Sequence, residues 1–222
     1  MENSPEIVIA VDGPSGSGKS SASRGVASAL GLRYLDTGAM YRALTWWLVT
    51  HGVDPGDRAA VAERAGVPHI QVGTDPDDPW VSVDGNDVSL DIRTHRISTT
   101  VSAVASVPEV RATLIAQQRE IIDAARTGIV AEGRDIGTVV APGAAVKVFL
   151  TAGGAARAAR HAADQGTSEV QTEADHARRD RLDAAQSAKA RDAIVLDSTD
   201  LTLDEVVGRI VELARRIPER AC

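Results

Sequence analysis

The feature that most constrains the fold is the stretch VDGPSGSGKSS, Val11 to Ser21. An apolar, β-branched run precedes it and predicts a buried strand, and a helix-compatible run follows it. Within the stretch, four residues fit the spacing G-x-x-x-x-G-K-[ST], in which backbone N–H groups cradle phosphate oxygens. These residues are Gly13, Gly18, Lys19 and Ser20. The alternative, a flexible Gly/Ser linker, is disfavoured by the strand and the helix on either side.

The loop is poor in side chains because its backbone must approach a phosphate closely. Lys19 is expected to reach the β- and γ-phosphates, and the Ser20 hydroxyl to ligate Mg²⁺. Free N–H groups at the start of the helix add partial positive charge. The residues expected to bind ATP are Gly13, Pro14, Ser15, Gly16, Ser17, Gly18, Lys19, Ser20 and Ser21.

Composition limits the classes of protein to which the chain can belong. Its 222 residues, 43% hydrophobic and 25% charged, suit an ordinary globular protein with one core and a small inserted lobe. The net charge of -7 argues against a general nucleic-acid binder. The single cysteine, Cys222, excludes an internal disulfide framework, and no apolar stretch approaches the roughly 20 residues of a membrane span. Because the short polar start also lacks signal-peptide features, we expect a cytoplasmic protein without membrane partners. We also expect a monomer that binds no nucleic acid.

Short apolar runs alternate with longer helix-compatible segments. This alternation predicts an α/β fold, a parallel sheet of about five strands flanked by helices. The expected strands are Ile7 to Val11, Arg33 to Leu35, Ile129 to Ala131, Val146 to Leu150 and Ile194 to Leu196. The expected helices include Ser20 to Leu30, Ala39 to His51, Pro108 to Arg126 and Leu203 to Ile217.

Two regions depart from this alternation. Between His69 and Val88, apolar and polar residues alternate around Pro, Asp and Gly turns, which predicts an insert of short antiparallel strands. Later in the chain, arginines gather in an alanine-rich segment and then on a predicted helix. On their own, such charges indicate solvated, salt-bridged helix faces. The arginines are Arg157 and Arg160, followed by Arg178, Arg179 and Arg181.

Two further segments place polar groups at predicted strand ends. In YLDTGAMYR, a polar, Gly-containing turn joins a strand to a helix that carries Tyr41 and Arg42 in its first turns. Ligands of doubly wound sheets lie outside the carboxyl ends of the strands. We therefore expect Asp36, Thr37 and Arg42 to share the rim of the sheet with the phosphate-binding loop.

The second segment is VAEGRDIGTVV, Val130 to Val140. Glu132, at the end of a predicted strand, could hold a water on Mg²⁺. Arg134 could clamp the phosphate of an acceptor, and Asp135 could accept hydrogen bonds from an amino group. The alternative for Arg134 and Asp135 is an ion pair that only stabilises the turn.

With these segments in place, the chain resembles the bacterial cytidylate kinases, of the nucleoside monophosphate kinase family. The resemblance rests on GPSGSGKS, LDTGAMYR, DIRT, VPEVR, EGRDIGTVV and LDST, in this order over roughly Ile7 to Leu213. It implies that ATP, with Mg²⁺, phosphorylates CMP or dCMP. It also implies a single domain composed of a core (5–37, 127–152 and 192–217), a nucleoside monophosphate-binding lobe with a β-rich insert (38–126) and a helical lid (153–191).

The resemblance implies a role for each matching residue. The residues that would contact cytosine are Thr37, Ser102, Arg111 and Asp135. The acceptor phosphate would bind Arg42 and Arg134, joined by Arg93, and the ribose would bind Arg179 and Asp183. Asp36 and Tyr41 complete the expected CMP site. The residues expected to act in catalysis are Lys19, Arg134, Arg157 and Arg160, and those expected to hold the metal are Ser20 and, through a water, Glu132.

One segment departs from the family pattern. After Asp183 the family usually has a further arginine on the acceptor phosphate, whereas this chain has Gln186 in the shortened stretch AAQSAKARDA. Lys189 or Arg191 could substitute for that arginine. Two alternatives therefore remain: a kinase for another acceptor, such as UMP or AMP, and a nucleotide-binding regulatory protein with impaired catalysis.

Overall fold

A parallel sheet organises the chain. The computed structural model describes residues 7–157 and 169–217. Its main sheet has five strands in the order β2-β6-β1-β7-β8, and every neighbouring pair is parallel. The strands are β1 (Val8–Asp12), β2 (Arg33–Asp36), β6 (Ile129–Gly133), β7 (Val146–Thr151) and β8 (Ile194–Asp197). All five expected strands are confirmed, with ends that differ by at most two residues from those expected.

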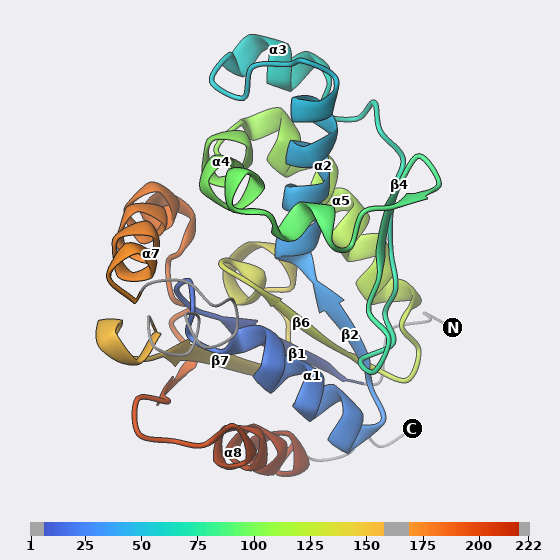
Figure 1. Ribbon diagram of the computed structural model, residues 1–222. Helices are drawn as coiled ribbons and strands as arrows, with labels where there is room; N and C mark the ends of the chain where they lie inside the picture. The colour runs from blue at the N-terminus through green and yellow to red at the C-terminus, as the bar shows by residue number, and fades with distance from the viewer. Residues whose placement is uncertain (1–6, 158–168, 218–222) are drawn as a thin grey trace.

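Helices bury both faces of this sheet, which explains why its strands are almost continuously apolar. Successive residues of a strand point to opposite faces, so Ile9 and Val11 pack against α1 (Lys19–Leu30) and α8 (Leu203–Arg215). Ala10 instead packs on the side of α2 (Thr37–Thr50) and α5 (Pro108–Ala124). Figure 1 shows α1 and α8 below the sheet and α2 and α5 above it.

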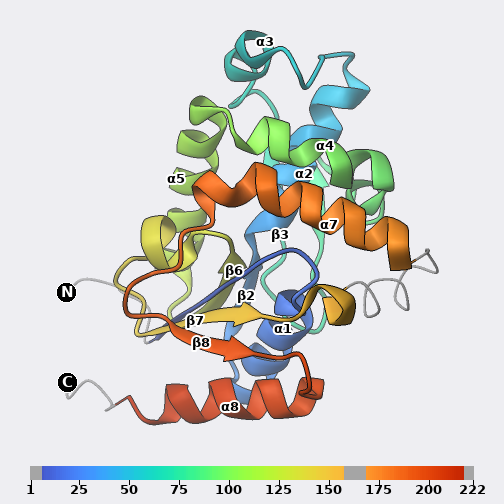
Figure 2. The ribbon, with the colours of Figure 1, turned by 90° about the vertical axis from the view of Figure 1, so that its left-hand side faces the viewer.

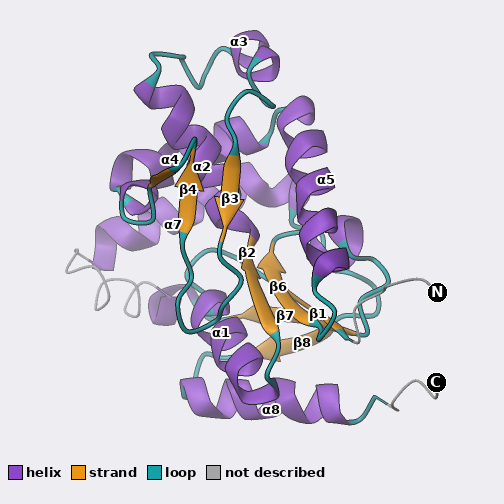
Figure 3. Ribbon diagram, turned by 90° about the vertical axis from the view of Figure 1, so that its right-hand side faces the viewer, coloured by secondary structure: helices purple, strands orange, loops and turns teal. Residues whose placement is uncertain are grey.

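The segment between β2 and β6 contains the predicted insert. Its small antiparallel sheet comprises β3 (Ile70–Val72), β4 (Val81–Val83) and β5 (Asn86–Asp87), which confirms the strand pattern expected there. Figure 3 shows β3 and β4 beside α2, away from the main sheet. The Trp47 indole N–H of α2 donates to the Asp84 carboxylate at 3.0 Å and so fastens the insert to this helix.

Several helical elements between β2 and β7 were not expected from the sequence. They are α3 (Arg58–Glu63), α4 (His95–Ala105) with the short 3₁₀ helix Asp91–Arg93 before it, and a π-helix at Ile136–Val140. Only Arg134 and Asp135 separate the π-helix from the end of β6, and all of these residues belong to the segment EGRDIGTVV. It therefore fixes the backbone that presents the polar end of that motif.

The second arginine cluster lies on a helix, as predicted. This helix, α7 (Glu169–Asp183), is followed by a 3₁₀ turn at Ala184–Gln186. It contacts α4, and Figure 2 shows it running across the view above the strands β1, β6 and β7. Among the described residues, no helix combines the length and the apolarity needed to cross a membrane.

Candidate active site

The phosphate-binding loop joins β1 to α1, as the motif predicts. β1 ends at Asp12, and α1 begins at Lys19. Gly13 has a φ of +154°, and a Cβ at this position would lie 2.0 Å from the carbonyl oxygen of Leu150 in β7. The loop is therefore pressed against the end of the neighbouring strand, and no side chain fits at its first glycine.

Asp12 fastens this loop to the segment after β6. Its buried carboxylate accepts hydrogen bonds from the backbone N–H groups of Ile136 and Gly137, each at 2.8 Å. Burial raises the pKa of Asp12, and the two N–H donors offset part of that effect. The sequence interpretation missed this residue, for which the only signal was its place between the strand and the loop.

Lys19 lies near two other cationic side chains, those of Arg134 and Arg179. Its side chain is buried, and its Nζ donates to the carbonyl oxygen of Pro14 at 2.7 Å. Burial and then the charge of Arg134 lower the pKa of Lys19 to about 7. Burial, followed by the charges of Arg134 and Arg42, lowers the pKa of Arg179 to about 10. An anionic ligand would relieve this mutual repulsion.

Three arginines at this end of the sheet have a buried Nε without an acceptor among the described residues. They are Arg42, Arg157 and Arg179. Buried donors in native proteins almost always have a partner. These guanidinium groups therefore favour an anionic or strongly polar ligand in the site.

Arg134 and Asp135 each bind a residue from a distant element. Arg134 Nη1 donates to the carbonyl oxygen of Gly13 at 2.6 Å, and its Nε lies 3.2 Å from Asp183 Oδ2 in α7. Asp135 forms its ion pair with Arg111 of α5. The alternative in which Arg134 and Asp135 pair with each other to stabilise the turn is therefore wrong.

The Arg111–Asp135 ion pair forms the polar centre of a pocket that residues of α2 and α4 help to line. Its side chains are 19% and 10% exposed. The buried hydroxyls of Ser102 and Tyr41 belong to residues that line the same cavity. The Ser102 hydroxyl has no partner among the described residues, and the hydrogen-bonding neighbour of Tyr41 is Gln118. Burial raises the pKa of Tyr41 to about 12, so the phenol stays neutral. A carboxylate, a guanidinium and hydroxyls together can read a base that presents an amino group beside ring acceptors.

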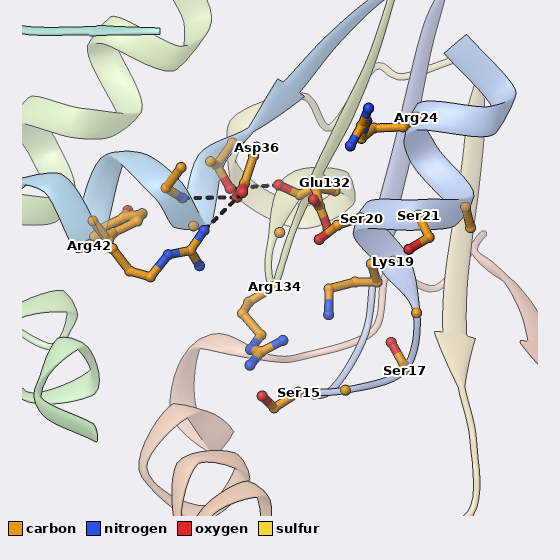
Figure 4. Close-up of a pocket in the computed structure, with 18 of the residues that line it drawn as sticks. Ser15, Ser17, Lys19, Ser20, Ser21, Arg24, Asp36, Arg42, Glu132 and Arg134 are labelled. Carbon is orange, nitrogen blue, oxygen red and sulfur yellow. Dashed lines mark hydrogen bonds and ion pairs between the residues drawn. The ribbon is translucent and has the colours of Figure 1, made fainter. Parts of the chain in front are cut away.

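Glu132 is buried at the end of β6, beside the start of α1. The Tyr34 hydroxyl donates to its Oε1 at 2.5 Å, and the Ser20 hydroxyl is a second hydrogen-bonding neighbour. Burial and then the nearby charge of Asp36 raise the pKa of Glu132. Figure 4 shows Ser20 and Lys19 on the side of the site that Glu132 faces. The sequence interpretation missed Tyr34, which it treated only as part of a strand end.

Asp36 carries the second carboxylate of this corner. It pairs with Arg42 at 2.8 Å and caps α2 by accepting from the Ala39 N–H, also at 2.8 Å. Burial alone would raise the pKa of Asp36, but Arg42 and the Ala39 N–H outweigh burial and lower it. The neighbouring Thr37 hydroxyl donates to the Glu132 carbonyl at 2.7 Å, which ties β2 to β6 at the rim.

One cavity of about 1060 Å³ joins the phosphate-binding loop to the Arg111–Asp135 pocket. Most residues singled out from the sequence line it. From the loop and the start of α1 these are Ser15, Gly16, Ser17, Gly18, Lys19, Ser20 and Ser21. From the other elements they are Asp36, Thr37, Tyr41, Arg42, Arg93, Ser102, Arg111, Glu132, Arg134, Asp135, Arg179 and Asp183.

The remaining predicted residues lie elsewhere. Gly13 and Pro14 belong to the loop but do not line the cavity, and Arg157 contacts Ser15 from outside the lining. Arg160 lies outside the described residues. In the altered segment after α7, Gln186 lines the cavity, whereas the exposed Lys189 and Arg191 do not.

One end of the cavity is lined by residues that the sequence interpretation did not single out. They come from the segment between β8 and α8 and from the start of α8: Leu201, Thr202, Leu203 and Val206. These residues give that end a largely apolar wall beside the phosphate-binding loop. Apolar residues before and at the start of a terminal helix are indistinguishable in sequence from core residues, so only the fold reveals their place in the cavity.

Comparison with solved structures identifies the fold. A gluconokinase from Sinorhizobium meliloti matches with a TM-score of 0.52 at 17% identity, covering 96% of this chain and 94% of that chain. An uncharacterised protein from Eubacterium ventriosum matches with a TM-score of 0.53 at 12% identity, covering 95% of this chain and 99% of that chain. These likenesses show that the chain shares its α/β fold with these two proteins, one of which is a kinase.

Comparison of sequences identifies the family. Residues 9–216 match the protein-family model described as cytidylate kinase. A cytidylate kinase of Streptomyces coelicolor is 51% identical over 228 residues, covering 96% of each chain. Another, of Nocardia farcinica, is 44% identical and covers 99% of this chain and 97% of its own length. The chain therefore belongs to the cytidylate kinase family.

Proposed function

We propose that the protein transfers the γ-phosphoryl group of ATP to CMP or dCMP, forming ADP and CDP or dCDP. The observation that carries this proposal is a single cavity that contains both the phosphate-binding loop and the Arg111–Asp135 pocket. Donor and acceptor can therefore meet in one site. The identity with relatives named cytidylate kinase, 51% for the protein of Streptomyces coelicolor, supports the choice of acceptor.

The donor would bind at the loop. Its phosphates would accept hydrogen bonds from the loop N–H groups and from Lys19. The wall formed by Leu201, Leu203 and Val206 is suited to one face of the adenine ring. ATP would then span the cavity from this apolar wall to the cationic end near Arg134.

The acceptor would bind with its base in the Arg111–Asp135 pocket. The Asp135 carboxylate would accept a hydrogen bond from the exocyclic amine of cytosine, and Arg111 would donate to its ring nitrogen and carbonyl. The unpartnered Ser102 hydroxyl would supply one more polar contact, and Thr37 and Tyr41 also line the cavity.

The rest of the nucleotide would extend from this pocket toward the loop. The acceptor phosphate would bind Arg42, Arg134 and Arg93, since planar guanidinium groups suit bidentate contact with phosphate. The ribose hydroxyls would contact Arg179 and Asp183 of α7. All five residues line the cavity, and the unpartnered Nε atoms of Arg42 and Arg179 support an anionic ligand there.

The corner formed by Ser20, Glu132 and Asp36 fits Mg²⁺. All of its donor atoms are oxygens, and the proximity of Asp36 raises the pKa of Glu132, a strain that a cation would relieve. No cluster of three or more His, Cys, Asp or Glu side chains able to hold a metal occurs in the described residues. This agrees with Mg²⁺ chemistry, in which one or two protein ligands are completed by waters and substrate phosphates. Ser20 would ligate the ion and Glu132 would hold one of its waters. When bound, Mg²⁺ would neutralise charge on the β- and γ-phosphates.

Phosphoryl transfer requires alignment and charge neutralisation rather than covalent catalysis. An oxygen of the acceptor phosphate attacks the γ-phosphorus as the bond to the β–γ bridging oxygen breaks, and that oxygen leaves with the electron pair on ADP. The attacking oxygen is already anionic, so no general base is needed. Lys19, Arg134 and the lid arginines Arg157 and Arg160 would neutralise the moving charge, and closure of the lid would exclude water.

The division of the chain follows from these roles. The core would comprise residues 5–37, 127–152 and 192–217, residues 38–126 would form the acceptor lobe, and residues 153–191 the lid. We propose that the protein acts as a monomer in the cytoplasm, where ATP and CMP are available.

The proposal is tested by measuring ADP release with ATP and Mg²⁺ in the presence of CMP, dCMP, UMP, AMP or GMP. The expected result is rapid release that depends on CMP or dCMP and is lost in Lys19→Ala. Faster release with UMP or AMP would assign another acceptor. Tight ATP binding without release on any acceptor would instead favour a regulatory protein, and would attribute the loss of activity to the altered segment Ala184 to Ala193.

A further inference from the structure

A carboxylate of α7 occupies part of the phosphate-binding loop. Asp180 Oδ1 accepts a hydrogen bond from the backbone N–H of Ser15 at 3.0 Å. Its Oδ2 lies 2.5 Å from Nη1 of Arg157, and the same Nη1 donates to the Ser15 carbonyl oxygen at 2.8 Å. Ser15, Arg157 and Asp180 thus each contact the other two. These contacts join the two described parts of the proposed lid, residues 153–157 and 169–191, to the loop.

The hydrogen bond between Ser15 and Asp180 is unusual because its donor is a backbone N–H of the phosphate-binding loop. Backbone N–H groups of such loops are positioned to bind phosphate oxygens. A carboxylate oxygen is an anionic acceptor of the same kind. Within the described residues, Ser15 is the one member of the loop whose N–H donates to a carboxylate. Asp180 thus holds a position that competes with a phosphate of the donor.

The side chain of Arg157 is fixed by hydrogen bonds but still has an unused donor. Its side chain is 15% exposed, and its Nε is buried without an acceptor among the described residues. The contacts to Asp180 and to the Ser15 carbonyl fix the guanidinium against the loop and leave this donor unused. An arginine fixed in this way can bind an arriving phosphate with little further ordering.

We propose that Asp180 is a positioning residue for the phosphoryl transfer described above. Before ATP binds, it occupies the Ser15 N–H and orients Arg157. When ATP binds, the donor phosphates displace the carboxylate from the Ser15 N–H, and Arg157 is already beside them. This inference rests on the proposed function for its catalytic half, whereas the competition for the Ser15 N–H concerns ATP binding alone.

The proposal predicts opposite effects on binding and on turnover. Asp180→Asn removes the charge and leaves a weaker neutral acceptor. The dissociation constant of ATP, measured by titration without acceptor, should fall by about threefold to tenfold, the range for one competing hydrogen bond. At saturating ATP and CMP, kcat should fall by about tenfold because Arg157 is no longer oriented. Asp180→Glu, which restores the charge, should move both values back toward wild type.

Two controls separate this role from simpler explanations. Asp183→Asn removes the same charge from α7 at the carboxylate that pairs with Arg134, but Asp183 accepts from no N–H of the loop. Its effect on ATP affinity should therefore be smaller than that of Asp180→Asn. In a double-mutant cycle, Asp180→Asn should lower kcat little further in an Arg157→Ala background, because both changes remove one function.

The outcomes are separable. If Asp180→Asn leaves ATP affinity unchanged or weakens it, or if Asp183→Asn tightens ATP binding equally, Asp180 does not compete with the donor. If the effects of Asp180→Asn and Arg157→Ala on kcat are additive, Asp180 does not act through Arg157. Absence of CMP-dependent turnover in the wild-type protein would contradict the proposed function, and the ATP titration would still decide the competition.

Discussion

At the scale of single residues, the protonation state of Lys19 should make ATP binding depend on pH. Its pKa of about 7 follows from burial and from Arg134, so near neutral pH the free site holds a partly deprotonated amine. Donor phosphates favour the ammonium form and raise this pKa. ATP binding should therefore take up protons between about pH 7 and pH 8, and ATP affinity should fall as the pH rises through this range.

Proton uptake can be measured by titration calorimetry at about pH 7.5 in two buffers that differ in ionisation enthalpy. The apparent enthalpy should depend on the buffer in the wild-type protein and much less in Lys19→Met. A buffer-independent enthalpy in the wild type, or proton release on binding, would contradict the assigned state of Lys19.

Asp135 is the residue on which base recognition depends. Replacement by Ala removes the acceptor for the cytosine amine and leaves Arg111 without its ion-pair partner. The kcat/KM for CMP should fall by about tenfold to a hundredfold, the range for a hydrogen bond to a charged group, while the dissociation constant of ATP changes less than about twofold. Both constants can be obtained from initial rates and from ATP titration. If kcat/KM for CMP and the affinity for ATP fell by the same factor, Asp135 would stabilise the fold rather than recognise the base.

Most residues of the site could be predicted because they stand in short motifs at strand ends. What the motifs do not reveal is which of these residues pair with one another. Arg134 pairs with Asp183 and Asp135 with Arg111, both across elements that are remote in sequence. Tyr34 was missed for the same reason, because its bond to Glu132 joins two strands that become neighbours only in the sheet.

At the scale of secondary-structure elements, the junction of β1, the loop and α1 depends on close packing. Gly13→Ala would place a Cβ 2.0 Å from the Leu150 carbonyl oxygen at a φ of +154°. The free energy of unfolding should fall by about 3 kcal/mol or more, the sum of backbone strain and overpacking. ATP binding should weaken as well, because the loop must shift.

Gly31→Ala is the matched control for this change. Gly31 also has a positive φ, +66°, but a Cβ there meets no atom within 4 Å. Its loss of stability should be about 1 kcal/mol, with ATP affinity unaffected. Chemical denaturation and ATP titration of both variants test this difference. Similar losses in the two variants would show that contact with β7 does not constrain the loop.

The elements themselves were predictable where hydrophobic periodicity is strong. All five strands of the main sheet and the antiparallel insert follow from their apolar patterns. The helices α3 and α4 were missed because one is a six-residue helix and the other begins within the polar segment DIRTHR. The π-helix after β6 was missed because its sequence, IGTVV, reads as a strand, and its geometry depends on Asp12 binding its first N–H groups.

At the scale of the whole molecule, function depends on bringing residues that are distant in sequence to one edge of the sheet. The parallel sheet brings the carboxyl ends of β1, β2 and β6 to one rim, which places the loop, Asp36 and Glu132 together. The insert, α4 and α5 close one side of the cavity, and α7 passes over another (Figure 2). Sequence patterns predicted the rim. The depth of the cavity and its apolar end depend on packing between distant segments and could not be predicted.

The central claim is that one cavity transfers a phosphoryl group directly from ATP to CMP. The most direct test follows the label from ATP carrying ³²P in its γ-phosphate, with CMP and Mg²⁺ present, and separates the products. The account predicts that label appears in CDP in step with ADP and that little appears as inorganic phosphate. Label found mainly in inorganic phosphate, or ATP that remains intact in the presence of CMP, would contradict it.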